Sequence, residues 1–450
     1  MAGNINNVLG ILTPVLLLCS GLYFLFRLKG FCFFHPIKMI KTILKKEKGD
    51  GNSPVRALTL ALAGTLGVGN IVGVASSIKL GGYGAVFWMW VSAAVAMILK
   101  YAEIVLALIY RRVGKDGEFH GGAYYYIREF FVKNKLARLG SFMGGLFAIL
   151  CIMNSVSMGG IIQANAISSA FLGEFGVPLW LSGLVVALFS LFIIMGNSEK
   201  IASFTEKIVC VMSIGYTVVS VAVMGVYHDR ILPSLFLIFE SAFNFKSAGF
   251  GVLGFLFASS FRLGCMRGLM SNEAGCGTAP TAHASSNVSM PAKQGLLGVV
   301  EVFVDTIVLC SMTAFVIIIA GERVLINENP MMITLSSFEI LLGEAAGIFI
   351  CISVLLFGFA TIVCWAHYGR EALNFICKST LAGKIFVLLY AVFVFFGSVC
   401  SVSLAWDIAD LCLGLMTVIN VIILCLMNKD VKSETDKLIM YWKSMKNNSA

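Results

Sequence analysis

One stretch of the chain, residues 58–75, is mostly apolar and yet crowded with glycine. It reads Leu-Thr-Leu-Ala-Leu-Ala-Gly-Thr-Leu-Gly-Val-Gly-Asn-Ile-Val-Gly-Val-Ala. A helix in lipid must pair its backbone groups internally, and each interior glycine weakens a helix by about 1 kcal/mol relative to alanine. A broken helix is tolerated at membrane depth only beside a protein-lined cavity, so the segment predicts an interrupted span. Freed amides there can hold an anion and freed carbonyls a cation, which suits a small zwitterion accompanied by an ion.

The composition places the whole chain in a membrane. Of its 450 residues, 58% are hydrophobic and 13% are charged, whereas a soluble domain is roughly 45–50% apolar and about 25% charged. The thirteen cysteines show neither a C-x-x-C pair nor zinc-site spacing. We therefore expect an all-α integral membrane protein that is not an enzyme and has no cofactor.

Apolar runs of about 20 residues, the length of one crossing, recur through the sequence. They predict eleven spans, near 8–27, 57–80, 84–110, 140–170, 178–196, 205–227, 249–270, 294–320, 335–365, 383–400 and 404–427. A shorter apolar stretch within 228–248 is expected to lie along a membrane face.

The lysines and arginines predict the orientation of these spans, because they favour cytoplasmic loops. With the N-terminus outside and the C-terminus in the cytoplasm, 26 of the 33 basic residues fall in cytoplasmic segments and three in external ones. The net charge of +9 is thus a topology signal of a multi-pass plasma-membrane protein. It does not indicate nucleic-acid binding.

Ten spans follow the first one, and they divide into two sets of five that lie in opposite orientations. The predicted organisation is an extra N-terminal helix (1–30), a basic linker (31–56), a first repeat (57–227), an external connection (228–248), a second repeat (249–427) and a basic tail (428–450). Each repeat opens with a glycine-interrupted segment, 57–80 or 249–270. Matched interrupted helices in inverted halves point to a transport site.

The first interruption offers candidates for both cargoes. Amides near Gly67, Val68, Gly69 and Asn70 would face the positive end of the following half-helix and suit a carboxylate. Carbonyls between Ala63 and Leu66, together with the Thr65 hydroxyl, suit sodium. Close packing of a glycine-rich face against another helix is the structural alternative.

Two other spans carry polar or aromatic side chains that could complete the site. Gln163 and Asn165 in the fourth span are candidate substrate contacts, with hydrogen bonding between helices as the alternative. In the ninth span, the Thr361 hydroxyl and the Gly358 carbonyl could hold a cation. Trp365, one turn further, could wall the pocket, or it could be an interfacial anchor.

Ionisable residues inside spans are functional candidates by default. Glu301 and Asp305 share one face of the eighth span, and we expect Asp305 to pair with Arg262. The stretch Ser271–His283 is expected to be a cytoplasmic loop that acts as a hinge or inner gate, within which Glu273 and His283 could pair. Proton coupling through one of the acids is an alternative to sodium coupling.

The chain resembles the alanine/glycine:cation symporter family, the sodium–alanine carriers. Gly-Asn-Ile-Val-Gly-Val-Ala at 69–75 and Ser-Asn-Glu-Ala-Gly at 271–275 carry the resemblance most specifically, supported by 87–90, 361–365 and Tyr-Gly at 368–369. The resemblance covers roughly residues 1–430. It implies the inverted-repeat fold of the bacterial leucine transporter.

By motif match the resemblance also implies roles for single residues. Those implied to meet the substrate are Gly67, Val68, Gly69, Asn70 and Gln163, with Trp365 in the pocket. Those implied to serve the cation are Ala63, Leu66 and Thr361. The family commonly has threonine where this chain has Val68, a change beside the proposed pocket.

Together these observations favour a symporter that imports small neutral amino acids with sodium by alternating access. Alanine and glycine are the expected substrates, with D-alanine as a further candidate. The alternative is a proton-coupled amino-acid symporter of the same fold. A membrane-embedded enzyme would need a nucleophile with its base, or a metal cluster, and the sequence shows neither. The expected partners are the amino acid, sodium and membrane lipid, and the protein is expected to be monomeric.

Overall fold

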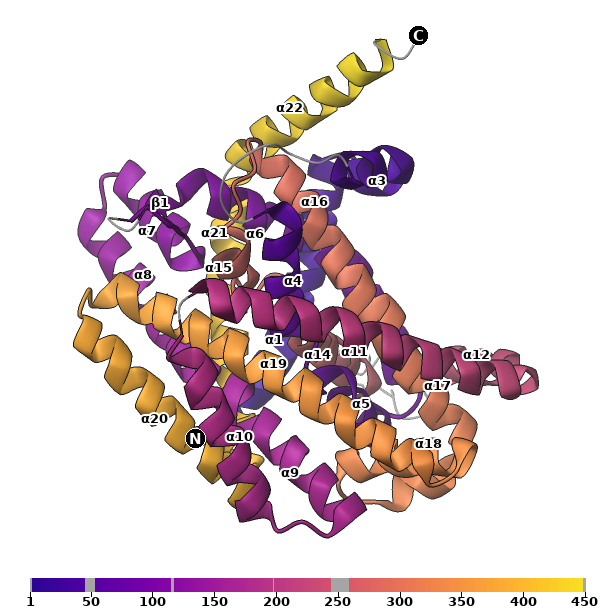
Figure 1. Ribbon diagram of the computed structural model, residues 1–450. Helices are drawn as coiled ribbons and strands as arrows, with labels where there is room; N and C mark the ends of the chain where they lie inside the picture. Colours follow the sequence, from indigo (N-terminus) through magenta and orange to yellow (C-terminus); the bar gives the residue numbers. More distant parts are fainter. Residues whose placement is uncertain (1, 45–52, 115–116, 197, 244–258, 448–450) are drawn as a thin grey trace.

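The computed structural model describes residues 2–44, 53–114, 117–196, 198–243 and 259–447. Most of these residues are helical (Figure 1). The helices up to residue 243 are α1 (Ala2–Arg27), α2 (Phe31–Phe34), α3 (Pro36–Leu44), α4 (Pro54–Thr65), α5 (Val72–Gly81), α6 (Gly84–Tyr110), α7 (Ala123–Lys133), α8 (Ala137–Asn154), α9 (Ile162–Phe175), α10 (Leu179–Ile194), α11 (Ser198–Val226) and α12 (His228–Phe243).

The later helices are α14 (Ser259–Asn272), α15 (Ala279–His283), α16 (Pro291–Val302), α17 (Ser311–Ala320), α18 (Pro330–Leu342), α19 (Ala345–Ile376), α20 (Thr380–Val399), α21 (Ser403–Leu426) and α22 (Asn428–Asn447). Wider π-helical turns, η2 (Ser155–Ile161) and η3 (Phe303–Cys310), join α8 to α9 and α16 to α17. The tighter 3₁₀ turns are η1 (Val68–Asn70) and η4 (Glu322–Ile326). Strands β1 (Arg112–Val113) and β2 (Phe119–His120) form one short antiparallel pair.

Eight helices in the described part are long and apolar enough to cross a membrane, and α4 with α5 makes a ninth when the pair counts as one span. The predicted spans 84–110, 294–320, 383–400 and 404–427 coincide with such helices. The predicted span 178–196 matches α10, a shorter apolar helix. The prediction of a multi-pass helical membrane protein is confirmed.

The first interruption lies where the glycines predict it. Helix α4 begins at Pro54, with the Ser53 hydroxyl accepting a hydrogen bond from the Arg56 amide at 3.1 Å. Such a capped start with proline in the first turn is typical of helix N-termini. The helix ends at Thr65, and the chain bends by 58° before it continues through η1 into α5.

The second interruption that the structure describes lies beyond the predicted segment. Residues 249–258 of the predicted segment 249–270 lie outside the described residues, but α14 runs unbroken through Gly264 and Gly268 to Asn272. Both glycines serve helix packing, since a Cβ on Gly264 would lie 2.3 Å from the Ala85 carbonyl oxygen of α6. The break instead spans 273–278, where Glu273, Gly275 and Gly277 have positive φ.

The stretch Ser271–His283 is therefore not an exposed loop, as the prediction of a cytoplasmic loop required. It contains the end of α14, the second break and all of α15, and Glu273 and His283 are fully buried. We expected a loop because polar and glycine residues dominate the stretch. Their buried hydrogen bonds explain why the protein accommodates them inside.

The bounds predicted for the ninth span were also wrong. The predicted range 335–365 combines the end of α18 with the first two thirds of α19, and the two helices are separated at Gly343, which has φ +86°. Glycine adopts this left-handed conformation without the strain that a Cβ would cause. Helix α19 then continues to Ile376, past the predicted end, and lies across the bundle between α11 and α20 (Figure 1).

Candidate functional site

The bend between α4 and α5 removes regular helical hydrogen bonds at the middle of the segment. In a continuous helix the Gly67 and Val68 amides would donate to the Ala63 and Gly64 carbonyls. Instead, the Gly67 amide donates to the Thr65 carbonyl at 2.8 Å, and the Val68 amide turns away from the helix. The break therefore leaves the Val68 amide and the Ala63 and Gly64 carbonyls without a hydrogen-bond partner in their own helix. Groups from other helices must bond to them.

Gln163 from α9 supplies the partner of the exposed amide. Its side-chain oxygen accepts a hydrogen bond from the Val68 amide at 3.0 Å, and its side-chain nitrogen donates to the Met158 carbonyl at 3.1 Å. Met158 lies in η2, so the wider turn of that helix takes part in holding the amide group. The structure thus brings Gln163 against the predicted substrate segment.

Helix α19 supplies the partners of the exposed carbonyls. The Thr361 hydroxyl lies 3.1 Å from the Ala63 carbonyl oxygen and 3.5 Å from that of Leu66. One turn along, the Trp365 indole donates to the Gly64 carbonyl at 3.3 Å. Trp365 is fully buried, so the interfacial-anchor alternative is wrong.

Oxygen atoms gather around the Thr361 hydroxyl. Besides the Ala63 and Leu66 carbonyls, the Phe357 carbonyl of its own helix lies 3.0 Å away. Hard cations such as sodium bind oxygen ligands, and backbone carbonyl oxygens are among them. The carbonyl in contact belongs to Phe357, whereas Gly358 gives α19 room against Ile167, which a Cβ would approach to 2.9 Å.

Thr65 and Asn70 flank the break and point toward α16 and η3. The Thr65 hydroxyl contacts the Glu301 carboxylate at 3.4 Å as well as the Ala61 carbonyl of its own helix at 3.2 Å. The Asn70 amide nitrogen donates to the Asp305 carboxylate at 2.7 Å and to the Ser271 hydroxyl at 3.1 Å. Asn70 therefore joins the first break to the end of α14.

One predicted substrate contact lies elsewhere. The Asn165 amide nitrogen donates to the Gly397 carbonyl of α20 at 3.1 Å, which is the alternative of a hydrogen bond between helices.

The small residues of the break are packed closely against α19. A Cβ on Gly67 would lie 2.7 Å from the Thr361 hydroxyl. Next to it, Val68 is completely buried.

Both ion pairs expected from the sequence are wrong. Arg262 contacts the Asn7 side chain at 3.5 Å, while Asp305 is bonded to Asn70, Ser271 and Thr306. Glu273 accepts from the Thr278 hydroxyl at 2.6 Å, and His283 pairs with another carboxylate. Opposite charge suggested these pairs, but in the structure Asp305 and Glu273 accept hydrogen bonds from uncharged side chains.

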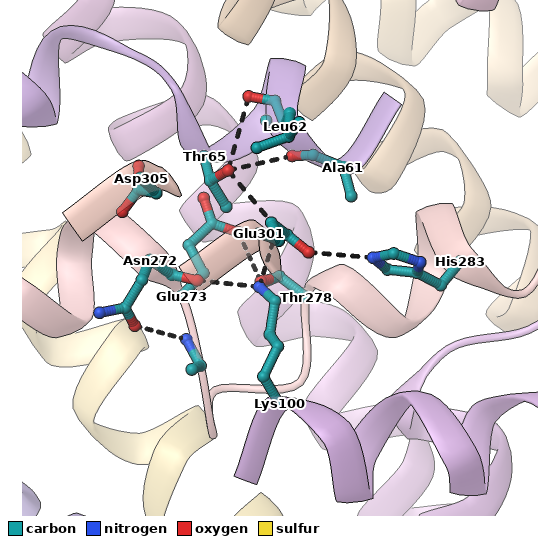
Figure 2. A network of polar contacts seen from close by, with 12 residues as sticks. Ala61, Leu62, Thr65, Lys100, Asn272, Glu273, Thr278, His283, Glu301 and Asp305 are labelled. Atoms are coloured by element: carbon teal, nitrogen blue, oxygen red, sulfur yellow. Dashed lines mark hydrogen bonds and ion pairs between the residues drawn. The ribbon is translucent and has the colours of Figure 1, made fainter. Parts of the chain in front are cut away.

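A buried network of charged side chains adjoins the break (Figure 2). Lys100 of α6 forms an ion pair with Glu301 of α16, with Nζ and Oε1 3.1 Å apart and both side chains fully buried. His283 lies 2.9 Å from the other carboxylate oxygen of Glu301. Among the described residues, no group of three or more His, Cys, Asp or Glu side chains could hold a metal ion.

Some residues near the break were missed by the sequence analysis. The Thr334 hydroxyl of α18 contacts the Ile71 carbonyl at 3.3 Å, and nothing in its local sequence marks it. Ser271 was assigned to a loop, although the family motif at 271–275 could have drawn attention to it. Lys100 lies in a long apolar run, where an isolated lysine is itself a functional signal.

Sequence comparisons relate this chain to one family of known proteins. A family model described as the sodium:alanine symporter family matches residues 1–449. A sodium/alanine symporter of Methanococcus maripaludis is 35% identical over 429 residues, covering 94% of this chain and 92% of that protein. A probable sodium/glutamine symporter of Bacillus subtilis is 34% identical over 424 residues, covering 93% of this chain and 85% of that protein.

Solved structures resemble the fold at low sequence identity. The crystal structure of MhsT in complex with L-phenylalanine has a TM-score of 0.59 and 13% identity, covering 87% of this chain and 93% of that one. At this identity the likeness concerns the fold alone.

Proposed function

The chain belongs to the sodium:alanine symporter family, and from this membership we propose that it imports small neutral amino acids, alanine and glycine above all, together with sodium. The observation that carries the proposal is the 58° break between α4 and α5. At this break the Val68 amide faces α9 and the Ala63 carbonyl faces α19, and neither group bonds within its own helix. Broken helices of this kind hold anionic substrate groups at amides and cations at carbonyls.

The amino-acid carboxylate would bind at the positive start of the half-helix that follows the break. In the structure the Gln163 side-chain oxygen accepts from the Val68 amide, so a substrate carboxylate would take over that position and be a stronger acceptor. The crowding around Gly67 and the buried Trp365 support a small substrate side chain. D-alanine remains a candidate within the same proposal.

The sodium ion would bind among the carbonyls of Ala63 and Leu66 and the Thr361 hydroxyl. These oxygens belong to α4, to Leu66 directly after it and to α19, so a cation between them would link the broken helix to α19. Alternating access would follow from movement of the broken helices against the rest of the bundle.

The proposal extends to the architecture. We propose two inverted sets of five helices after one extra N-terminal helix, with the N-terminus outside, the C-terminus in the cytoplasm and a monomeric protein. The two breaks, at 66–71 and 273–278, support the repeat because each follows the first half of a corresponding helix.

Uptake by the purified protein in proteoliposomes tests the function. We expect labelled alanine to accumulate when sodium is high outside, and unlabelled glycine to compete with it. Accumulation driven by a proton gradient without sodium would replace sodium with the proton. Absence of uptake for alanine, glycine and glutamine under either gradient would refute the proposal.

A further inference from the structure

An ion pair between α6 and α16 contacts both helix breaks. Lys100 and Glu301 are fully buried, with 3.1 Å between Nζ and Oε1. Burying two charges is costly, and a well-packed apolar pair of similar volume is often at least as stable. The contacts of this pair show what else it does.

Lys100 and Glu301 reach the last residue before each break. The Lys100 ammonium donates to the carbonyl of Asn272, where α14 ends, at 2.8 Å. The Glu301 carboxylate accepts from the hydroxyl of Thr65, where α4 ends, at 3.4 Å. Figure 2 shows both helix ends converging on this one pair.

The pair also reaches the far side of the second break through His283 of α15. The His283 Nε2 lies 2.9 Å from Glu301 Oε2, and its Nδ1 lies 2.8 Å from the Gln294 amide nitrogen. That nitrogen also donates to the carbonyl of Pro54, the first residue of α4, at 3.3 Å. Because Gln294 and Glu301 are both on α16, this helix holds α4 at its start and at its end.

We propose that Lys100 and Glu301 are positioning residues. They hold the ends of α4 and α14, and so the two breaks, in a fixed relative position, and this position shapes the binding site at the first break. The inference rests on the proposed function, in which α4 supplies carbonyls to the cation and leads into the amide for the carboxylate. Neither side chain needs to contact the substrate. A change in the pair would shift the end of α4 relative to Thr361 and Gln163.

A paired substitution separates positioning from stability. Glu301→Gln keeps the shape of the side chain but removes the carboxylate that forms the ion pair with Lys100, so we expect a lower melting temperature. In the double variant Lys100→Met/Glu301→Gln both charges of the ion pair are gone, and we expect the melting temperature to rise above that of Glu301→Gln. We expect the half-saturating concentrations of alanine and sodium to stay about tenfold above the wild-type values in the double variant. Its methionine cannot donate to the Asn272 carbonyl, and its glutamine bonds His283 more weakly than the carboxylate does.

Gln294→Leu provides a milder variant, should the double variant fail to fold. It removes the ties to Pro54 and His283 without exposing a charge, and we expect half-saturating concentrations about threefold higher. Glu129→Gln, at a partly exposed ion pair with Arg112, is the matched control for the amide substitution. Wild-type half-saturating concentrations in the folded double variant and in Gln294→Leu would overturn the inference.

A labelling measurement tests the inference without relying on transport. Cys276 lies in the second break, Cys351 of α19 contacts the Ala170 carbonyl of α9, and both cysteines are fully buried. We expect N-ethylmaleimide, followed by peptide mass spectrometry, to modify Cys276 faster in Gln294→Leu than in the wild type, with Cys351 unchanged. Equal rates at Cys276 would contradict the inference, whereas a wild-type protein without amino-acid uptake would contradict only the proposed function.

Discussion

Thr361 shows how a hydroxyl group can take over the work of a missing backbone hydrogen bond. A buried carbonyl left without a partner costs about 1–3 kcal/mol, and the bend at the first break leaves Ala63 in that position. The hydroxyl of Thr361 covers it from α19 at 3.1 Å. The same hydroxyl can turn its lone pairs to a cation, because its hydrogen rotates freely.

In the proposed sodium site this hydroxyl is a ligand, so we expect the sodium response to be the property most sensitive to it. We expect Thr361→Ala to raise the half-saturating sodium concentration by about tenfold, equivalent to 1.4 kcal/mol, while the preference among alanine, glycine and glutamine stays as in the wild type. Thr361→Ser, which keeps the hydroxyl, should retain a nearly normal response. A normal sodium dependence of uptake in Thr361→Ala would mean that the cation binds elsewhere.

Gly159 makes room for the buried side chain of Trp365. A Cβ at this position would lie 2.2 Å from the Cβ of Trp365, closer than packing allows. We expect Gly159→Ala to destabilise the protein by about 1–3 kcal/mol, as overpacking of a core does, and to lower the melting temperature. Gly145→Ala in α8, where nothing lies within 4 Å of the new Cβ, is the matched control and should melt like the wild type.

At the level of elements, the glycines of the first break differ in how closely other residues pack against them. A Cβ on Gly67 would come within 2.7 Å of the Thr361 hydroxyl, a Cβ on Gly69 would keep 3.7 Å from Ser271, and a Cβ on Gly73 would meet nothing within 4 Å. Only the first of these glycines lies at the contact between α4 and α19. Gly69 lies in η1 before the next half-helix, and Gly73 lies in the first turn of α5.

The increasing space for a Cβ from Gly67 to Gly73 predicts the order in which three alanine substitutions reduce uptake. We expect Gly67→Ala to reduce alanine uptake by about a hundredfold, since small displacements at a binding geometry can cost that much. Gly69→Ala and Gly73→Ala should stay within about threefold of the wild type. Uptake rates normalised to the amount of folded protein would measure this, and equal losses at Gly67 and Gly73 would show that helix flexibility, rather than contact with α19, matters here.

The sequence predicts the elements near the first break well because the signal there is local. Glycine density reveals a weak helix, and Gln163, Thr361 and Trp365 are unusual enough in apolar spans to be noticed. The break at 273–278 was not predicted, because the polar residues Ser271, Asn272 and Glu273 suggested a loop there. The partners of Asp305 and His283 could not be predicted, since they depend on how distant helices pack.

For the whole molecule, helix α20 divides two exposed native cysteines. Cys377 precedes it and Cys400 follows it, and both are exposed. Thr380–Val399 is long and apolar enough to cross the membrane, so the two thiols should lie on opposite sides. The orientation with the N-terminus outside places Cys377 in the cytoplasm, among segments rich in lysine and arginine.

Labelling from one side of the membrane then tests the orientation of the whole chain. We expect a membrane-impermeant maleimide to modify Cys400 in intact cells and to leave Cys377 unmodified. In inside-out vesicles Cys377 should react and Cys400 should not, because the cytoplasmic face is then presented to the reagent. Cys400→Ser should abolish the signal in cells, which would separate it from reaction at other thiols. Modification of Cys377 in intact, sealed cells would reverse the orientation, and with it the direction in which the sodium gradient acts on the two breaks.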